Sequence, residues 1–251
     1  MSGIPQDLAE AIAQARSATL AALDEGLTLI QVELVLPELK VMPVAESFLA
    51  ALEPWGDRLK IFFPDAGAAA LARRDWGDRP FRITDVGSGR TPMTGKVQPE
   101  DGIFLFIEPS AVEVTQVEQL CQEAGDRPVI FLNPRMEDLA IIGIGYAGRQ
   151  LRDRFLNRIV TAYYLRPIEG AAVRRAFPGQ WEVWLEPADE NADYQLVATR
   201  PQRPAGEALD EILLQATGGE DTNSANAAVN AAAQRQGFLG QLQNFLKALS
   251  N

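Results

Sequence analysis

Short apolar runs alternate with stretches of helical periodicity over the first half of this chain, and no other feature constrains its fold as strongly. The strand-sized runs lie at residues 27–36, 59–63, 81–84, 103–107 and 129–132. The helical stretches span residues 8–23, 44–55, 66–76 and 112–124. Strands that alternate with helices of this length are typical of βαβ units, whose strands run parallel. The sequence therefore predicts an α/β fold with a doubly wound, mostly parallel sheet.

The pattern changes after Asn133. The predicted elements are strands at residues 161–165, 181–185 and 194–199 and helices at residues 149–159 and 207–216. Trp181, Val183 and Leu185 recur at every second position, so they face the same side of their strand. Residues 194–199 alternate as well, and such alternation is typical of an antiparallel edge with one solvated face. We therefore expect antiparallel strands to extend the sheet in the C-terminal part.

Composition divides the chain into three parts, of which residues 1–217 carry the α/β domain. Residues 218–236 are small and polar, which is typical of a flexible linker. Residues 237–251 predict an amphipathic helix. Its apolar face carries Phe238, Leu242, Phe245 and Leu249. A tethered helix of this kind suits capture of a partner, and docking on its own domain is an equal alternative.

The absence of histidine excludes large classes of catalytic site. Ser-His-Asp and Cys-His catalysis and imidazole metal sites all need a residue that this chain lacks. Cys121 is the single cysteine, so it is expected to be a buried hydrophobic residue in a protein of a reducing compartment. A net charge of −11 argues against nucleic-acid binding, because affinity for phosphates depends on Lys and Arg. We expect no metal, no cofactor, no secretory signal and no membrane span.

Four of the early strands end in a similar way, with a proline one or two residues beyond the apolar run. The carboxyl ends of parallel strands meet at one edge of a sheet, where ligands bind. The candidate ligand-binding residues at this edge are Asp65, Gly67, Glu108, Ser110, Asn133 and Arg135. Helix capping is the favoured alternative, because Asp65 and Ser110 suit helix starts and proline is common there.

Residues 143–148 match the G-x-G-x-x-G string of dinucleotide-binding loops, with an apolar strand before it and a helix after it. The string lies late in the domain, and no acidic residue ends a following strand at the expected spacing. A tight turn with close helix-to-sheet packing is therefore the favoured interpretation.

Arginines concentrate between Arg149 and Arg175. This range contains seven arginines and two acidic residues, so its net charge is +5. The candidate anion- or partner-binding residues on the predicted helix are Arg149, Arg152, Arg154 and Arg158. They indicate contact with a phosphate, an anionic headgroup or an acidic protein face. Pairing with the chain's own carboxylates is an equal alternative.

Several strings resemble a family of cyanobacterial and chloroplast proteins that is described as a domain of unknown function. The strings are residues 37–40 (PELK), 63–77 (FPDAGAAALARRDWG), 109–114 (PSAVEV), 133–135 (NPR) and 150–155 (QLRDRF). The resemblance spans roughly residues 5–216. The family includes the plant low-photosystem-II-accumulation assembly factors, and a similar domain extends a plastid adenylate kinase. The resemblance implies a phototroph and carries over no catalytic residue.

These features lead to two functional expectations. The first is a non-enzymatic assembly or interaction factor in photosystem II biogenesis, with a protein partner of photosynthetic membranes. Its expected location is the cyanobacterial cytoplasm, with at most peripheral contact with the thylakoid membrane. The alternative is a phosphate- or nucleotide-binding α/β module, or an enzyme that uses the edge formed by the strand ends, since carboxylates can still serve as acids and bases.

Overall fold

The computed structural model describes residues 3–87, 93, 95–137, 145–187 and 192–217. The predicted linker over residues 218–236 and the predicted helix over 237–251 lie outside the described residues. No helix among the described residues is long and apolar enough to cross a bilayer.

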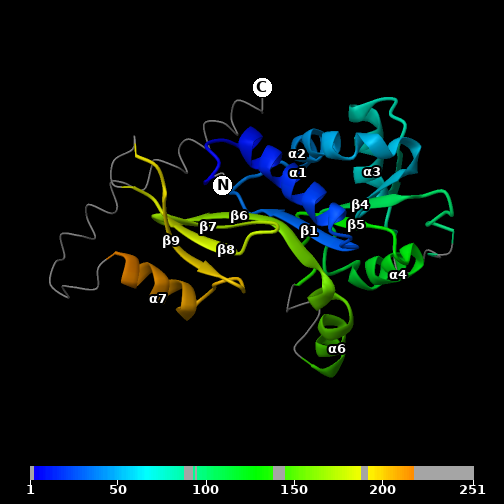
Figure 1. Cartoon of the computed structure of the whole chain (residues 1–251). Helices are drawn as coiled ribbons and strands as arrows, with labels where there is room; N and C mark the ends of the chain where they lie inside the picture. Colours follow the sequence, from blue (N-terminus) through cyan, green and yellow to red (C-terminus); the bar gives the residue numbers. More distant parts are fainter. Residues whose placement is uncertain (1–2, 88–92, 94, 138–144, 188–191, 218–251) are drawn as a thin grey trace. The chain divides into compact units, whose positions relative to one another are not determined.

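The strands form one nine-stranded sheet in the order β3-β2-β4-β5-β1-β6-β7-β8-β9 (Figure 1). Their bounds are β1 Leu29–Leu34, β2 Leu59–Phe63, β3 Arg82–Asp85, β4 Ile103–Ile107, β5 Val129–Leu132, β6 Val160–Ile168, β7 Ala171–Ala176, β8 Trp181–Leu185 and β9 Gln195–Arg200. The pairs among β1 to β5 are parallel, and those from β6 to β9 are antiparallel. The predicted fold class, a mostly parallel sheet with antiparallel strands added in the C-terminal part, is confirmed.

The helices occur where apolar periodicity predicts them, with differences at their ends. Their bounds are α1 Leu8–Asp24, α2 Val41–Phe48, α3 Ala66–Trp76, α4 Val114–Ala124, α6 Tyr146–Arg154 and α7 Glu207–Ala216, with 3-10 turns η1 Leu49–Ala51, η2 Glu53–Arg58 and η3 Leu156–Arg158. The helix predicted over residues 44–55 is confirmed for its first half only. α2 begins earlier, at Val41, and 3-10 turns replace the predicted second half, where Pro54 lacks a backbone donor and the following Gly56 adopts a φ of 53°.

The chain forms two compact units. The parallel unit comprises Arg16–Glu33 and Lys40–Ala162. The antiparallel unit comprises the described residues within Met1–Ala15, Leu34–Leu39 and Tyr163–Asn251.

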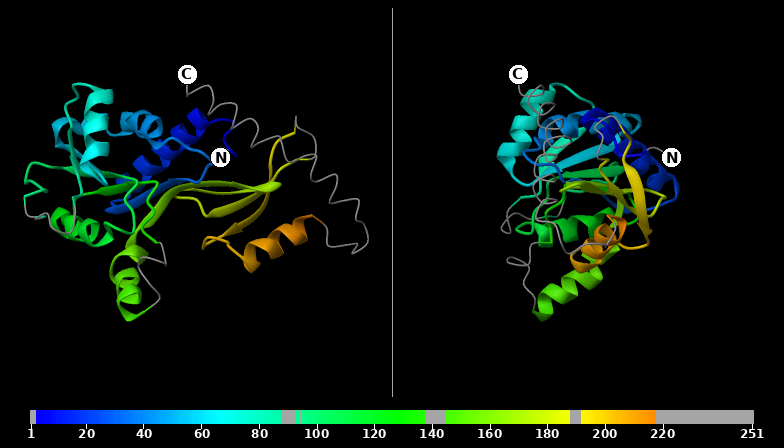
Figure 2. Two further views of the ribbon diagram at one scale, coloured as in Figure 1. Left: turned by 180° about the vertical axis from the view of Figure 1, so that it is seen from behind. Right: turned by 90° about the vertical axis from the view of Figure 1, so that its left-hand side faces the viewer.

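The core of the parallel unit forms around stacked phenylalanines. Every residue of β2, β4 and β5 is buried, because helices cover both faces of these strands. Figures 1 and 2 show α2 and α3 over one face and α4 over the other. The Phe106 ring lies 4.7 Å from Phe62 and 5.5 Å from Phe131, measured between ring centroids. Two-sided burial explains why these strands read as continuous apolar runs.

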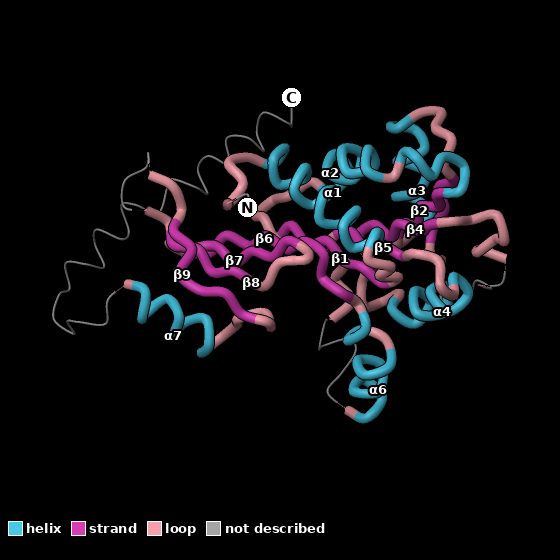
Figure 3. Tube along the Cα trace, viewed as in Figure 1, coloured by secondary structure: helices cyan, strands magenta, loops and turns pink. Residues whose placement is uncertain are grey.

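The antiparallel unit contains a strand that the sequence analysis missed. β7 has the sequence AAVRRA, whose two arginines hid its strand character. β8 and β9 form the antiparallel edge that was predicted for residues 181–185 and 194–199, and β9 is the outermost strand. Figure 3 shows α7 beside β8 and β9 of the same unit.

Candidate functional site

The carboxyl ends of β2, β4 and β5 lie next to one another, because these three strands are parallel neighbours. Asp65, Glu108 and Asn133 follow these ends, so the topology places them along one edge of the sheet. This strand-end edge is where an open α/β sheet binds ligands. The three positions therefore share the edge that the sequence indicated.

Glu108 and Asn133 adopt left-handed backbone conformations, with φ values of 46° and 49°. Each precedes a proline, which disfavours the right-handed helical region for the residue before it. Asparagine tolerates this conformation better than glutamate does. Left-handed residues other than glycine carry strain of about 1–3 kcal/mol and cluster at functional sites. Two left-handed residues at the ends of adjacent strands therefore indicate a functional site at this part of the edge.

The segments that follow β4 and β5 stay hydrogen-bonded to each other beyond Glu108 and Asn133. The Arg135 amide donates to the Pro109 carbonyl at 2.8 Å, and Ser110 and Arg135 form a parallel bridge. The Arg135 guanidinium contacts the Glu108 carboxylate at 3.0 Å. Because Arg135 is 74% exposed, this pair contributes little to stability. Glu108, Ser110 and Arg135 are therefore brought together, with Asn133 preceding them on β5.

Ser110 is bonded to the segment that leads into α4. Its hydroxyl contacts the Glu113 carboxylate at 2.5 Å and accepts a bond from the Val112 amide at 3.2 Å. Glu113, rather than Ser110, is the residue that immediately precedes the helix. Ser110 thus orders the turn before the helix.

Asp65 and Gly67 serve the start of α3. The Asp65 carboxylate accepts a hydrogen bond from the Ala68 amide at 2.9 Å, which satisfies a free donor of the first turn. A Cβ at Gly67 would lie 3.0 Å from an Asp65 carboxylate oxygen. Glycine at this position therefore leaves room for the cap, which gives the Pro-Asp-Ala-Gly string a structural role.

Replacement of Asp65 by alanine is expected to lower the free energy of unfolding by about 0.5–2 kcal/mol, the usual loss for a helix N-cap. Urea denaturation of the full chain measures this change. Asp65→Asn is the control, since its amide oxygen can still accept the Ala68 bond. Equal losses in the two variants would contradict the capping role.

The arginines of α6 are largely occupied within the protein. Arg154 binds Glu118 of α4 through two bonds of 2.6 and 2.8 Å, and this hydrogen-bonded pair raises the pKa of Arg154. Glu118 is buried, so Arg154 compensates a buried charge. Arg149 and Arg152 also take part in interactions within the chain. Arg158 is exposed, and no carboxylate of the described residues lies within ion-pair distance of it.

The glycine string is described only from Gly145 onward, and Gly143 lies outside the described residues. Gly145 precedes α6 with a φ of −70°. A Cβ built on it meets no atom within 4 Å. Neither the backbone nor the surroundings of Gly145 require glycine, whereas Gly148 of the same string is buried in α6.

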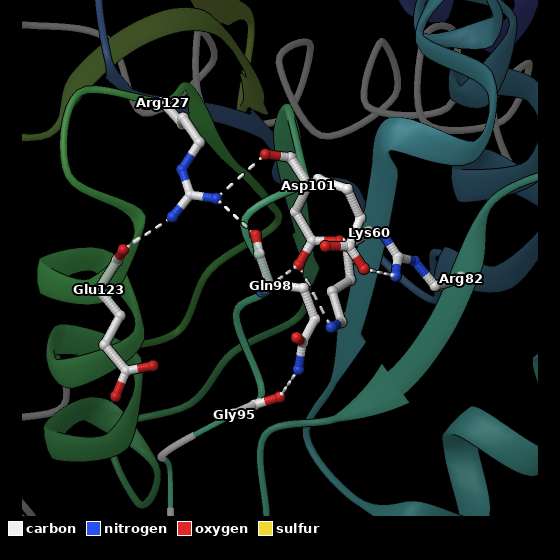
Figure 4. Close-up of polar contacts among 8 residues, drawn as sticks. Lys60, Arg82, Gly95, Gln98, Asp101, Glu123 and Arg127 are labelled. Carbon is white, nitrogen blue, oxygen red and sulfur yellow. Dashed lines mark hydrogen bonds and ion pairs between the residues drawn. The ribbon is translucent and has the colours of Figure 1, made fainter.

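A second polar cluster lies at the opposite, amino-terminal ends of the parallel strands (Figure 4). Asp101 has a fully buried side chain. Its carboxylate accepts hydrogen bonds from the side chains of Lys60 at 3.3 Å and Arg82 at 2.5 Å, and from the backbone amide of Gln98 at 2.7 Å. Arg127 donates to the carbonyls of Gln98 and Asp101 at 2.8 and 3.0 Å. The sequence pattern did not predict this amino-end cluster. The charged Lys60, inside an otherwise apolar strand, was a signal for it.

Cys121 is buried within α4, as expected. Burial raises the pKa of its thiol, so Cys121 is unsuited to act as a nucleophile.

The fold and the strand-end edge together define an α/β protein with a mostly parallel sheet. Residues 5–211 match the model of a protein family described as Domain of unknown function (DUF1995). The chain belongs to this family.

Proposed function

We propose that this protein is a non-enzymatic interaction or assembly factor that holds a protein partner of photosynthetic membranes during photosystem II biogenesis. The proposal places it in the cyanobacterial cytoplasm, with at most peripheral contact with the thylakoid. The process, photosystem II biogenesis, is inferred from the resemblance to plant assembly factors. Binding of a protein partner is inferred from exposed side chains on the segments beyond β4 and β5.

Two large, exposed apolar side chains on the segments beyond β4 and β5 carry the proposal. Val112, between β4 and α4, is 68% exposed, and Tyr146, at the start of α6, is 71% exposed. Their segments follow the carboxyl ends of neighbouring strands and are linked by the Arg154–Glu118 pair. Tyrosine is among the residues that contribute most to binding at protein interfaces. The nearby carboxylates and arginines contact one another, which favours a protein partner over a small polar ligand.

Capture of partners from solubilised thylakoid membranes by the tagged full chain, followed by mass spectrometry, tests the proposal. We expect photosystem II subunits or their assembly intermediates to be enriched by the wild-type protein. The paired variant Val112→Ser with Tyr146→Ser should lose about 2 kcal/mol of binding free energy, the scale of an interface hot spot. Leu214→Ser is the matched control, because Leu214 is 65% exposed but belongs to the antiparallel unit.

Two further observations decide the outcome of this experiment. If Arg158 contacts an anionic group of the partner, Arg158→Glu should weaken capture. Added salt should also weaken it, since exposed pairs are screened over about 8 Å at physiological ionic strength. Equal capture by the wild type, the paired variant and the control, or no enrichment of photosystem subunits, would contradict the proposal.

The strained residues Glu108 and Asn133 favour a second candidate, a phosphate- or nucleotide-binding module at the strand-end edge. Ser110 and Arg135 offer it a hydroxyl and a guanidinium. A rise in melting temperature with ATP that Arg135→Gln abolishes would identify that module.

A further inference from the structure

A row of arginines and aromatic rings crosses one face of the antiparallel unit. The strand register places Tyr164 opposite Arg175, Arg175 opposite Trp181, and Trp181 opposite Arg200. Directly opposed residues share a face of the sheet, so these four side chains lie in one row across β6, β7, β8 and β9. Arg203, just beyond β9, places its guanidinium carbon 5.5 Å from the Tyr164 ring centroid and 5.9 Å from that of Trp181.

The two aromatic rings form a rigid base under the arginines. Tyr164 and Trp181 are both buried, and their centroids lie 5.1 Å apart at an interplanar angle of 63°. The Arg175 guanidinium carbon lies 5.5 Å from the centroid of the Trp181 ring. Cation–π contacts orient a guanidinium but leave its hydrogen-bond donors available. The rings therefore hold Arg175 and Arg203 beside one indole without satisfying their donors.

The arginines of this row form no ion pair in the described part of the chain, although Leu209 of α7, whose first turn is acidic, packs against the same Tyr164–Trp181 face. No described carboxylate lies within ion-pair distance of Arg175, Arg200 or Arg203. Arg174, next to Arg175 on the other face of β7, contacts Glu182 at 2.6 Å. The Nε atom of Arg175 is buried without a hydrogen-bond partner among the described residues. Half-buried Arg175 has a lowered pKa, because burial penalises its charge.

We propose that Arg175, Arg200 and Arg203 form a binding site for a phosphate group, held over the Tyr164–Trp181 base. Three cations exceed the charge of one carboxylate, whereas a phosphate carries up to two negative charges and offers several oxygens to guanidinium forks. The phosphate is either free in solution or part of an anionic lipid headgroup. This site lies in the antiparallel unit, so it is independent of the strand-end edge and of the proposed partner surface.

Titration of the full chain with inorganic phosphate and pyrophosphate, at constant ionic strength with chloride as reference, tests the site. We expect a rise in melting temperature and a change in tryptophan fluorescence that Trp181→Phe removes. Arg203→Gln should weaken binding by about tenfold or more, the effect of losing hydrogen bonds to a charged group. Arg175→Gln should do the same while leaving the melting temperature without phosphate unchanged or higher, since it removes an uncompensated charge.

Matched variants separate binding at this site from general attraction of phosphate to exposed arginines. Arg74→Gln removes an exposed arginine of α3 in the parallel unit, which pairs with the exposed Asp75, and this variant should bind phosphate like the wild type. Cosedimentation with phosphatidylcholine vesicles that contain phosphatidic acid, whose phosphomonoester carries up to two negative charges, against phosphatidylcholine alone, tests the lipid source, and binding that Arg203→Gln removes supports it. The inference is overturned if neither phosphate, pyrophosphate nor these vesicles bind. It is also overturned if Arg74→Gln binds as weakly as Arg203→Gln, or if Arg135→Gln alone abolishes binding.

Discussion

Replacement of Asp101 by alanine is expected to lower the free energy of unfolding by about 3–5 kcal/mol, because removal of one partner leaves buried charge uncompensated. Lys60, whose side chain is 9% exposed, would lose the carboxylate that lies 3.3 Å away. Arg82 would lose its shorter contact with Asp101, and the Gln98 amide would lose its acceptor. Urea denaturation monitored by circular dichroism measures the change.

Glu100→Ala is the matched control for this prediction. Glu100 lies beside Asp101 and also contacts Arg82, at 3.0 Å, but its side chain is 60% exposed. Exposed pairs contribute little, so this variant should unfold nearly like the wild type. A small loss in Asp101→Ala, or equal losses in the two variants, would show that the amino-end cluster does not hold the parallel strands together.

Replacement of Glu182 by alanine should also lower the free energy of unfolding by about 3–5 kcal/mol, through the antiparallel unit. Glu182 contacts Arg174, whose side chain is 4% exposed, at 2.6 Å. It also accepts a 2.9 Å bond from the Trp184 indole. Arg174 donates to Gln14 of α1 at 3.1 Å as well, and Gln14 accepts a bond from Tyr163. Loss of Glu182 therefore removes the carboxylate with which this buried guanidinium forms its ion pair.

The double variant Arg174→Met with Glu182→Leu tests the cause of that loss. Removal of both charges leaves no uncompensated ion, so this variant should be more stable than Glu182→Ala alone. Thermal and urea unfolding of the three proteins give the comparison. A double variant less stable than Glu182→Ala would mean that the pair contributes through its bonds rather than through charge compensation.

Local pattern predicted the elements that are buried on both faces or that have clear ends. The strands at residues 59–63, 103–107 and 129–132 were predicted with their observed bounds, because continuous burial produces continuous apolar runs. The helix at residues 66–76 was predicted equally well, since Asp65 and Gly77 mark its ends.

Prediction failed where long-range contacts decide the structure. β7 contains Arg174 and Arg175, and only their cross-strand partners explain arginines in a buried strand. These cross-strand pairings leave no signal within a window of adjacent residues.

The sequence by itself determined the α/β class, the strand-end edge and the absence of histidine chemistry, because each follows from local periodicity or from composition. Only the tertiary structure decided which charges are satisfied. It paired Arg154 with Glu118 and enclosed Asp101 between Lys60 and Arg82. It placed Arg175 beside Trp181, with no carboxylate of the described residues within ion-pair distance. The physical reason is that electrostatic interactions depend on separation and burial in space. Arg154 and Glu118 lie 36 positions apart in the sequence, and Lys60 and Asp101 lie 41 positions apart.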